Sequence, residues 1–103
     1  MAKAVTFDAV QFRDNHKLIT QYLNDAFETS DVDVITKAIG DMLRAQGMSR
    51  ISKMVGLRRE GLYRSFGGQT GPGFDTVMKV LRALNIRIVA QPVAGGGGLK
   101  KGK

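Results

Sequence analysis

Residues 48–66, MSRISKMVGLRREGLYRSF, predict two short helices joined by a tight turn. In the first helix Ile51 and Val55 are four residues apart, and so are Leu62 and Phe66 in the second. A spacing of four places each pair on one helix face. Both helices can therefore close over one small hydrophobic core.

The turn and the outer face of this segment favour a particular kind of helix pair. Gly56 lies where the turn needs a positive φ, which glycine adopts without steric cost. The outward side chains are mostly basic: Arg50, Lys53, Arg58, Arg59 and Arg64. The pattern is typical of a DNA-binding helix-turn-helix, whose second helix enters the major groove. The apolar skeleton alone would suit any helical hairpin, so the prediction depends on the basic face.

The second helix carries residue types that suit base recognition. Arg58, Arg59 and Glu60 lie at its N-terminal end, which reaches base edges in this motif. Arg can contact guanine O6 and N7 through two N–H donors, and Glu can accept a hydrogen bond from cytosine N4. Tyr63 and Arg64 lie one turn further, within reach of bases or phosphates. Alternatively, Glu60 pairs with Arg64 inside the helix, which contributes about 0.2–0.5 kcal/mol.

The basic half of the chain begins at this segment. Residues 1–47 carry five Lys or Arg against seven Asp or Glu, net −2, whereas residues 48–103 carry eleven against two, net +9. Contacts between Lys or Arg and phosphates release counterions and drive association with a polyanion. Ser49, Arg50 and Lys53, on the first helix of the pair, are placed for such contacts, which position a protein without specifying sequence.

Three further helices are predicted, at about 14–29, 30–47 and 74–84, with the Gly-rich loop 67–73 before the last. The residues expected to face the core are Ile19, Leu23, Ala26 and Phe27 in the first, Ile35, Ala38, Ile39, Met42 and Leu43 in the second, and Phe74, Val77, Met78, Leu81 and Leu84 in the last.

Polar residues and glycine mark the ends of two of these helices. Asp14 or Asn15 can cap the first helix. Ser30 followed by Asp33 resembles a capping box for the second, and Gly47 is a good C-terminal stop.

The C-terminal part predicts a strand and a tail. Asn85 is a plausible left-handed cap, and Ile86–Gln91 is β-branched and roughly alternating, which favours a short strand stopped by Pro92. A lone strand lacks a partner in its own chain, so we expect it to pair with a second copy in a homodimer, or otherwise to pack as an extended tail. We therefore divide the chain into an N-terminal arm (1–13), a helical domain (14–91) and a flexible Gly/Lys-rich tail (92–103).

Composition excludes several classes of protein. At 103 residues the chain suits one compact domain, and it has no apolar run long enough to span a membrane. It has no cysteine, which fits a reducing cytoplasm. The lone histidine, His16, is expected to face solvent, and loop 67–73 lacks the Lys-Ser/Thr of a phosphate-binding P-loop. We predict no catalytic residue, metal site or cofactor, and no enzyme activity.

The region from about Val34 to Ala90 resembles a known family. GDMLRAQGMSRISKMVGLRREGLYRSF and FDTVMKVLRALNIRI are similar to the antidote (antitoxin) proteins of bacterial type II addiction modules, the HigA-like group with a λ-repressor-like fold. YLNDAFETSD, which precedes them, is also similar.

The resemblance implies an all-α, λ-repressor-like helix-turn-helix bundle of about five helices, with the short C-terminal strand added. It further implies a dimeric bacterial cytoplasmic protein that neutralises a small RelE/ParE-like toxin ribonuclease and represses its own operon by binding double-stranded operator DNA. A stand-alone helix-turn-helix regulator without a toxin is the alternative. The recognition helix would be Arg58–Phe66, the supporting helix Ser49–Val55, and toxin contacts are expected within Phe7–Phe27.

The chain departs from this family at two positions of the recognition helix. Arg58 stands where the family usually has Ser, so a favourable N-cap is missing. Gly61 also stands where Ser is common, and Gly inside a helix costs about 1 kcal/mol relative to Ala. We expect a less rigid recognition helix that DNA would order.

Overall fold

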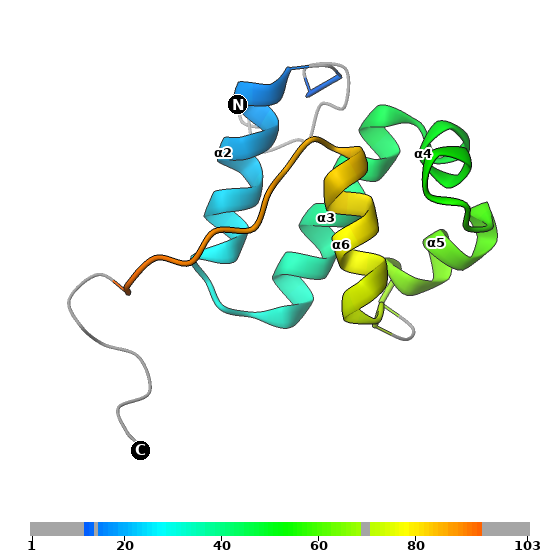
Figure 1. The fold of residues 1–103 in the computed structure, drawn as a ribbon. Helices are drawn as coiled ribbons and strands as arrows, with labels where there is room; N and C mark the ends of the chain where they lie inside the picture. The colour runs from blue at the N-terminus through cyan, green and yellow to red at the C-terminus, as the bar shows by residue number, and fades with distance from the viewer. Residues whose placement is uncertain (1–11, 14, 69–70, 94–103) are drawn as a thin grey trace, which may run out of the picture.

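The fold is described by a computed structural model over residues 12–13, 15–68 and 71–93. Its regular structure is entirely helical in these residues, which confirms the predicted all-α class but not the predicted strand (Figure 1). The helices are α2 (His16–Phe27), α3 (Val32–Gln46), α4 (Met48–Val55), α5 (Arg59–Ser65) and α6 (Phe74–Ala83).

Side-chain caps set the starts of α2 and α3. Asn15 caps α2, because its side chain accepts a hydrogen bond from Leu18 N at 3.1 Å. The predicted capping box at Ser30 is wrong, and Asp31 caps α3 instead. Ser30 has a left-handed φ of 55°, so the extended backbone that an N-cap needs falls on Asp31. The Asp31 carboxylate accepts hydrogen bonds from Asp33 N at 2.9 Å and Val34 N at 3.3 Å.

Two glycines shape the connections on either side of α4. Gly47 follows α3 with a φ of 101°, which confirms the predicted stop and turns the chain directly into α4. Gly56 ends α4 with a φ of 73° and a ψ of 28°, the left-handed conformation predicted at this turn. Leu57 and Arg58 then lead into α5, so α4 and α5 are separated by only three residues.

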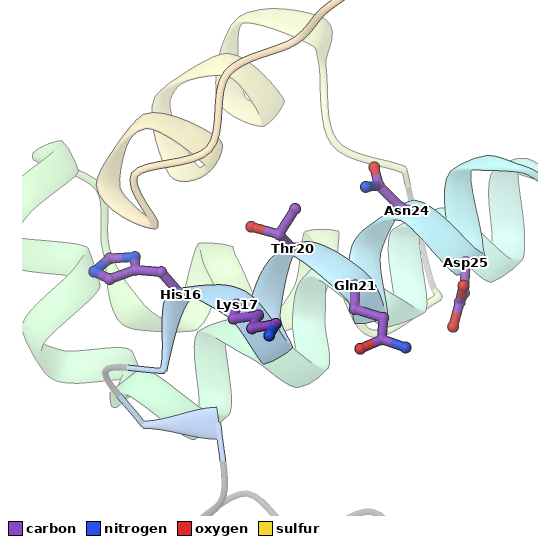
Figure 2. A pocket seen from close by; sticks show the side chains of 6 residues that line it. All are labelled: His16, Lys17, Thr20, Gln21, Asn24 and Asp25. Carbon is purple, nitrogen blue, oxygen red and sulfur yellow. The ribbon is translucent and has the colours of Figure 1, made fainter.

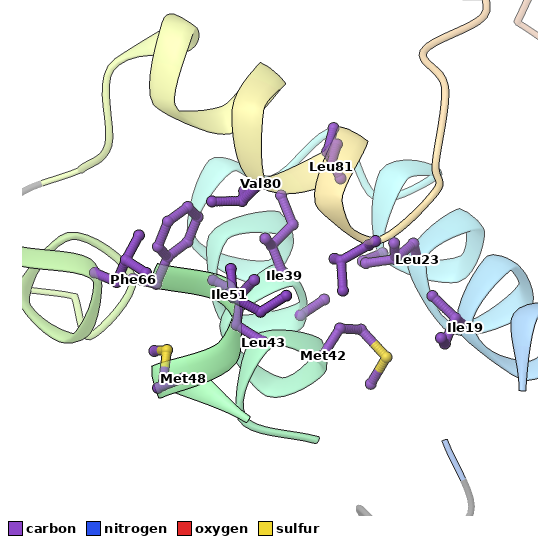
Figure 3. Close-up of a cluster of buried hydrophobic side chains, with 14 residues drawn as sticks. Ile19, Leu23, Ile39, Met42, Leu43, Met48, Ile51, Phe66, Val80 and Leu81 are labelled. Carbon is purple, nitrogen blue, oxygen red and sulfur yellow. The ribbon is translucent and has the colours of Figure 1, made fainter. Parts of the chain in front are cut away.

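The core lies where all five helices meet. Helix α2 packs on α3, α3 on α4, and α4 on both α5 and α6. In Figure 1, α2 lies on one side of the molecule and α4 and α5 on the other, with α3 and α6 between them. Figure 3 shows the buried side chains converging: Ile19 and Leu23 from α2, Ile39, Met42 and Leu43 from α3, Met48 and Ile51 from α4, Phe66 after α5, and Val80 and Leu81 from α6.

The inward face of α6 agrees with the predicted one at Val77, Leu81 and Leu84 and differs at two other positions. Phe74 and Met78 are 71% and 44% exposed, so their predicted burial is wrong. The buried stripe is carried by Val80, Leu81 and Leu84, with Val77 packed against it. Phe74 is the first residue of the helix, and Met78 lies on its flank beside the buried stripe.

No strand forms in residues 84–93, the described part of the chain after α6. The strand predicted at Ile86–Gln91 is therefore absent. The described residues contain no other strand with which its N–H and C=O groups could pair. The predicted left-handed Asn85 is confirmed by its φ of 64°. Ile86 packs against the core, whereas Ile88 and Val89 are exposed.

Little of the predicted arm and tail falls within the described residues. Residues 1–11 and 94–103, and with them Phe7, lie outside these ranges. Phe12 is half-buried: its ring meets that of Tyr22 edge-on at 5.1 Å, and its carbonyl accepts a hydrogen bond from Gln46 Nε2 at 3.1 Å. No helix in the described ranges is both long and apolar enough to cross a membrane.

Candidate nucleic-acid interface

Every residue predicted to contact DNA is exposed to solvent. Ser49, Arg50 and Lys53 lie on α4, Arg58 at the N-cap position of α5, and Arg59, Glu60, Tyr63 and Arg64 on α5 itself. We call these eight residues the α4–α5 surface. Since α4 and α5 pack on each other, the structure brings the predicted residues together on two neighbouring helices.

Two arginines of this surface are held by neutral partners. Arg59 Nη1 donates a hydrogen bond to Ser49 Oγ at 2.7 Å, which links the beginning of α5 to the beginning of α4. Arg50 Nη1 lies 3.5 Å from Gln46 Oε1, at the limit of a hydrogen bond. Neither partner neutralises the positive charge of the guanidinium it contacts.

The remaining charges of the surface are not neutralised within the described ranges. The ion pairs recorded there converge on Asp41, and none involves Lys53, Arg58 or Arg64. The alternative pair between Glu60 and Arg64 does not form. Both side chains instead line a shallow hollow with Tyr63 and Gly67 on the outer side of α5. The surface thus combines exposed positive charge with one carboxylate and one aromatic ring.

Helix α5 is positioned mainly by two apolar anchors. Leu62 is 1% exposed and Phe66 is 2% exposed, and both belong to the core. Gly40 of α3 allows the end of α5 to approach closely: a Cβ on Gly40 would lie 3.1 Å from Phe66 O and 3.2 Å from Phe66 Cβ. These contacts fix the end of α5 against α3 while its opposite face stays in solvent.

The beginning of α5 lacks the usual stabilising features. Arg58 occupies the N-cap with φ −73° and ψ 142°, and makes no side-chain cap hydrogen bond. Gly61 lies inside the helix, is exposed, and a Cβ there would meet nothing within 4 Å. The missing cap predicted at Arg58 is confirmed. The structure shows no packing reason for glycine at position 61.

A buried carboxylate on α3 forms the other polar cluster, which our sequence analysis missed. Asp41 is 8% exposed and accepts a hydrogen bond from Tyr22 Oη at 2.7 Å. Lys37 Nζ and Arg44 Nη1 lie 3.3 Å and 3.5 Å from its oxygens. Burial, the hydrogen bond to Asp41 and the negative charge of Asp41 together raise the pKa of Tyr22 to about 12. This cluster joins α2 to α3, because a buried carboxylate needs such partners.

The spacing of three residues in the cluster was available in the sequence. Lys37 and Arg44 stand four residues before and three after Asp41, so all three share a helix face. The contribution of Tyr22, 19 residues away, depends on the packing of α2 on α3.

A second hollow follows the outer side of α2 (Figure 2). Polar side chains of this one helix line it: His16, Lys17, Thr20, Gln21, Asn24 and Asp25. His16 is exposed, as predicted. No cluster of three or more His, Cys, Asp or Glu able to hold a metal ion occurs among residues 12–13, 15–68 and 71–93.

Comparison with known proteins gives two findings. Residues 3–92 match the family model described as "probable addiction module antidote protein". The chain is also 39% identical over 85 residues to a Haemophilus influenzae protein described as uncharacterized, which covers 82% of this chain and 88% of that protein. The comparison with solved structures found no match.

Proposed function

The chain belongs to the family of probable addiction module antidote proteins, and on this premise we propose that it is a DNA-binding antitoxin. An antidote of an addiction module has a toxin as its partner. We propose that this toxin is a small ribonuclease of the RelE/ParE type, and that the antitoxin also represses its own operon as a homodimer in the bacterial cytoplasm.

The observation that carries the DNA-binding part is the α4–α5 surface. Four of its cations, Lys53, Arg58, Arg59 and Arg64, are exposed and form no ion pair with a described carboxylate. Phosphates can therefore bind them without first displacing an internal anion. In the proposed complex α5 lies in the major groove as the recognition helix of a λ-repressor-like helix-turn-helix, and α4 supports it.

The homodimer is proposed from the residues after α6. Ile88, Val89 and Val93 are between 47% and 63% exposed, although they are apolar. Their N–H and C=O groups form no ladder within the described chain. Pairing of this segment with its counterpart in a second copy would bury the apolar side chains and satisfy the backbone. A two-fold dimer would also present two α5 helices to two operator half-sites.

Toxin contacts are proposed within Phe7–Phe27, a range that includes helix α2.

A growth assay tests the toxin half of the proposal. Expression of the toxin from the neighbouring gene should arrest growth, and co-expression of this chain should relieve the arrest and co-purify the toxin. If growth stays arrested and the two proteins do not associate, the antitoxin assignment is refuted.

The DNA half is tested by a mobility shift on the segment upstream of the chain's own gene. Arg59→Ala should weaken binding by about 1–3 kcal/mol if Arg59 reads a base. Lys17→Ala is the matched control, because it removes an exposed cation from α2, outside the α4–α5 surface. Absence of binding by the wild-type protein at low salt would refute DNA recognition.

A second candidate function is supported by the beginning of α5. Arg58 provides no side-chain cap, and Gly61 is exposed inside the helix. Both features destabilise α5, and a less rigid helix is less suited to binding in a DNA groove. The chain would then be chiefly a protein-interaction module that binds the toxin alone. Co-purification with the toxin together with no salt-dependent DNA affinity would favour this function.

A further inference from the structure

The hydrogen bond between Ser49 and Arg59 carries an inference about how DNA sequence is read, and it rests on the proposed DNA-binding function. The bond joins residues ten apart on different helices, at a distance of 2.7 Å. Both side chains are exposed, and Arg59 is the first residue of α5. The bond therefore fixes an arginine where the recognition helix begins.

The geometry of the guanidinium determines which donors remain available. Arg59 uses Nη1 to reach Ser49 Oγ, and no described residue accepts a hydrogen bond from its Nε or Nη2. Nε and Nη2 carry two parallel N–H groups, the edge of arginine that can bind two acceptors at once. Guanine presents such a pair of acceptors, O6 and N7, in the major groove.

The serine hydroxyl can serve both arginine and DNA. Ser49 Oγ accepts a hydrogen bond from Arg59 Nη1, so its own hydroxyl hydrogen remains available for a hydrogen bond to a phosphate oxygen. A flexible arginine loses side-chain entropy when it binds, which lowers affinity by roughly two- to tenfold per ordered side chain. An arginine already held by Ser49 loses less.

We propose that Ser49 is a positioning residue that holds Arg59 with its Nε–Nη2 edge free, and that Arg59 reads a guanine through this edge. Arg59 is then a specificity-determining residue, whereas Ser49 acts through it. Loss of either residue should weaken the contact with the same base pair, whereas the contacts of the two residues with phosphates should be independent of each other.

The test measures binding to two duplexes, the fragment upstream of the gene and a scrambled sequence of equal length and composition. Ser49→Ala should weaken binding to the upstream fragment by roughly two- to tenfold and binding to the scrambled duplex by less, because there only a phosphate contact of Ser49 is lost. Ser49→Thr should restore the loss, because threonine keeps the hydroxyl. Ser52→Ala is the matched control: it removes another hydroxyl of α4, which donates within the helix to Ser49 O at 2.9 Å.

A base analogue supplies a readout that a purely structural role of Ser49 would not change. Replacing guanines of the upstream fragment one at a time by 7-deazaguanine removes the N7 acceptor. At the contacted guanine, wild-type affinity should fall by about fivefold or more. This penalty should disappear in Arg59→Ala and shrink in Ser49→Ala.

Two results would overturn the inference while leaving DNA binding intact. One is an equal loss by Ser49→Ala on both duplexes, which would mean that Ser49 contacts phosphate only. The other is an unchanged 7-deazaguanine penalty in Ser49→Ala. In contrast, a wild-type protein that binds both duplexes equally would refute operator recognition itself, so the two failures are distinguishable.

Discussion

Replacing Gly61 with alanine should stabilise the protein, although the substitution lies in the proposed recognition helix. Gly61 has helical backbone in the interior of α5, is exposed, and a Cβ there would meet no atom within 4 Å. The substitution therefore adds no clash and removes only the conformational freedom that glycine has in the unfolded chain. Helix propensity sets the gain at about 0.8–1.0 kcal/mol. For a domain of this size, that gain corresponds to a rise in Tm of roughly 4–8 °C.

The assay is thermal and urea denaturation followed by circular dichroism, with Gly40→Ala as the matched control. A Cβ on Gly40 would lie 3.1 Å from Phe66 O and 3.2 Å from Phe66 Cβ, tighter than ordinary contact. Overpacking costs about 1–3 kcal/mol and offsets the propensity gain of about 1 kcal/mol. We therefore expect between no change and a loss of about 2 kcal/mol. A Tm for Gly61→Ala at or below that of wild type would refute this account of α5.

Three further predictions address other features of the fold. Arg58→Ser should stabilise α5 by about 1 kcal/mol in urea denaturation, because the N-cap backbone is already extended and needs only an acceptor; no gain would contradict this. Gly56→Ala should lower stability by about 1–2 kcal/mol, seen as a lower Tm, because its φ is 73°; an unchanged Tm would show that the turn relaxes. Burial and Asp41 raise the pKa of Tyr22 from 10.0 to about 12, so the unfolded chain loses this proton first and stability should fall as pH rises from about 10 to 12. Tyr22→Phe should make melting curves less sensitive to pH across that window, and equal sensitivity would contradict the assignment.

The sequence predicted the helices well where a single rule of spacing or turn chemistry determines them. Ile51, Leu62 and Phe66 are buried as their spacing of four required. Gly47 and Gly56 end helices with positive φ, as expected of residues without a Cβ. These features are local, so a window of a few residues contains all the relevant information.

The errors came from features that depend on neighbours distant in sequence. Phe74 and Met78 fit a helical stripe, but which stripe of α6 is buried depends on where α4 lies. The strand at 86–91 needs a hydrogen-bonding partner that the described residues of one chain do not supply. Ser30 had the right chemistry for a cap, and its left-handed backbone moved the cap to Asp31.

The candidate interface shows the same division. The exposure of its residues could be predicted, because it follows from the apolar pattern of α4 and α5, and their contact with DNA stays a prediction. The contact between Ser49 and Arg59 could not be predicted, since it depends on the angle at which the two helices meet across Gly56. The cluster around Asp41 combines both cases: Lys37 and Arg44 follow from helical spacing, whereas Tyr22 requires the packing of α2 on α3.

The folding of α5 and its proposed action on DNA are linked through the same few residues. The helix has seven residues and no side-chain cap, and glycine occupies one interior position, so its own propensity does not sustain it. Leu62 and Phe66 hold its C-terminal part in the core, while its N-terminal part is connected to α4 by the hydrogen bond from Arg59 to Ser49. Because the proposed base-reading residues lie at this N-terminal part, any contact that orders it also orders them. Gly61→Ala and Arg58→Ser would strengthen the helix without adding a DNA contact. An increase in operator affinity by Gly61→Ala would therefore measure how much binding free energy the wild-type protein uses to order α5.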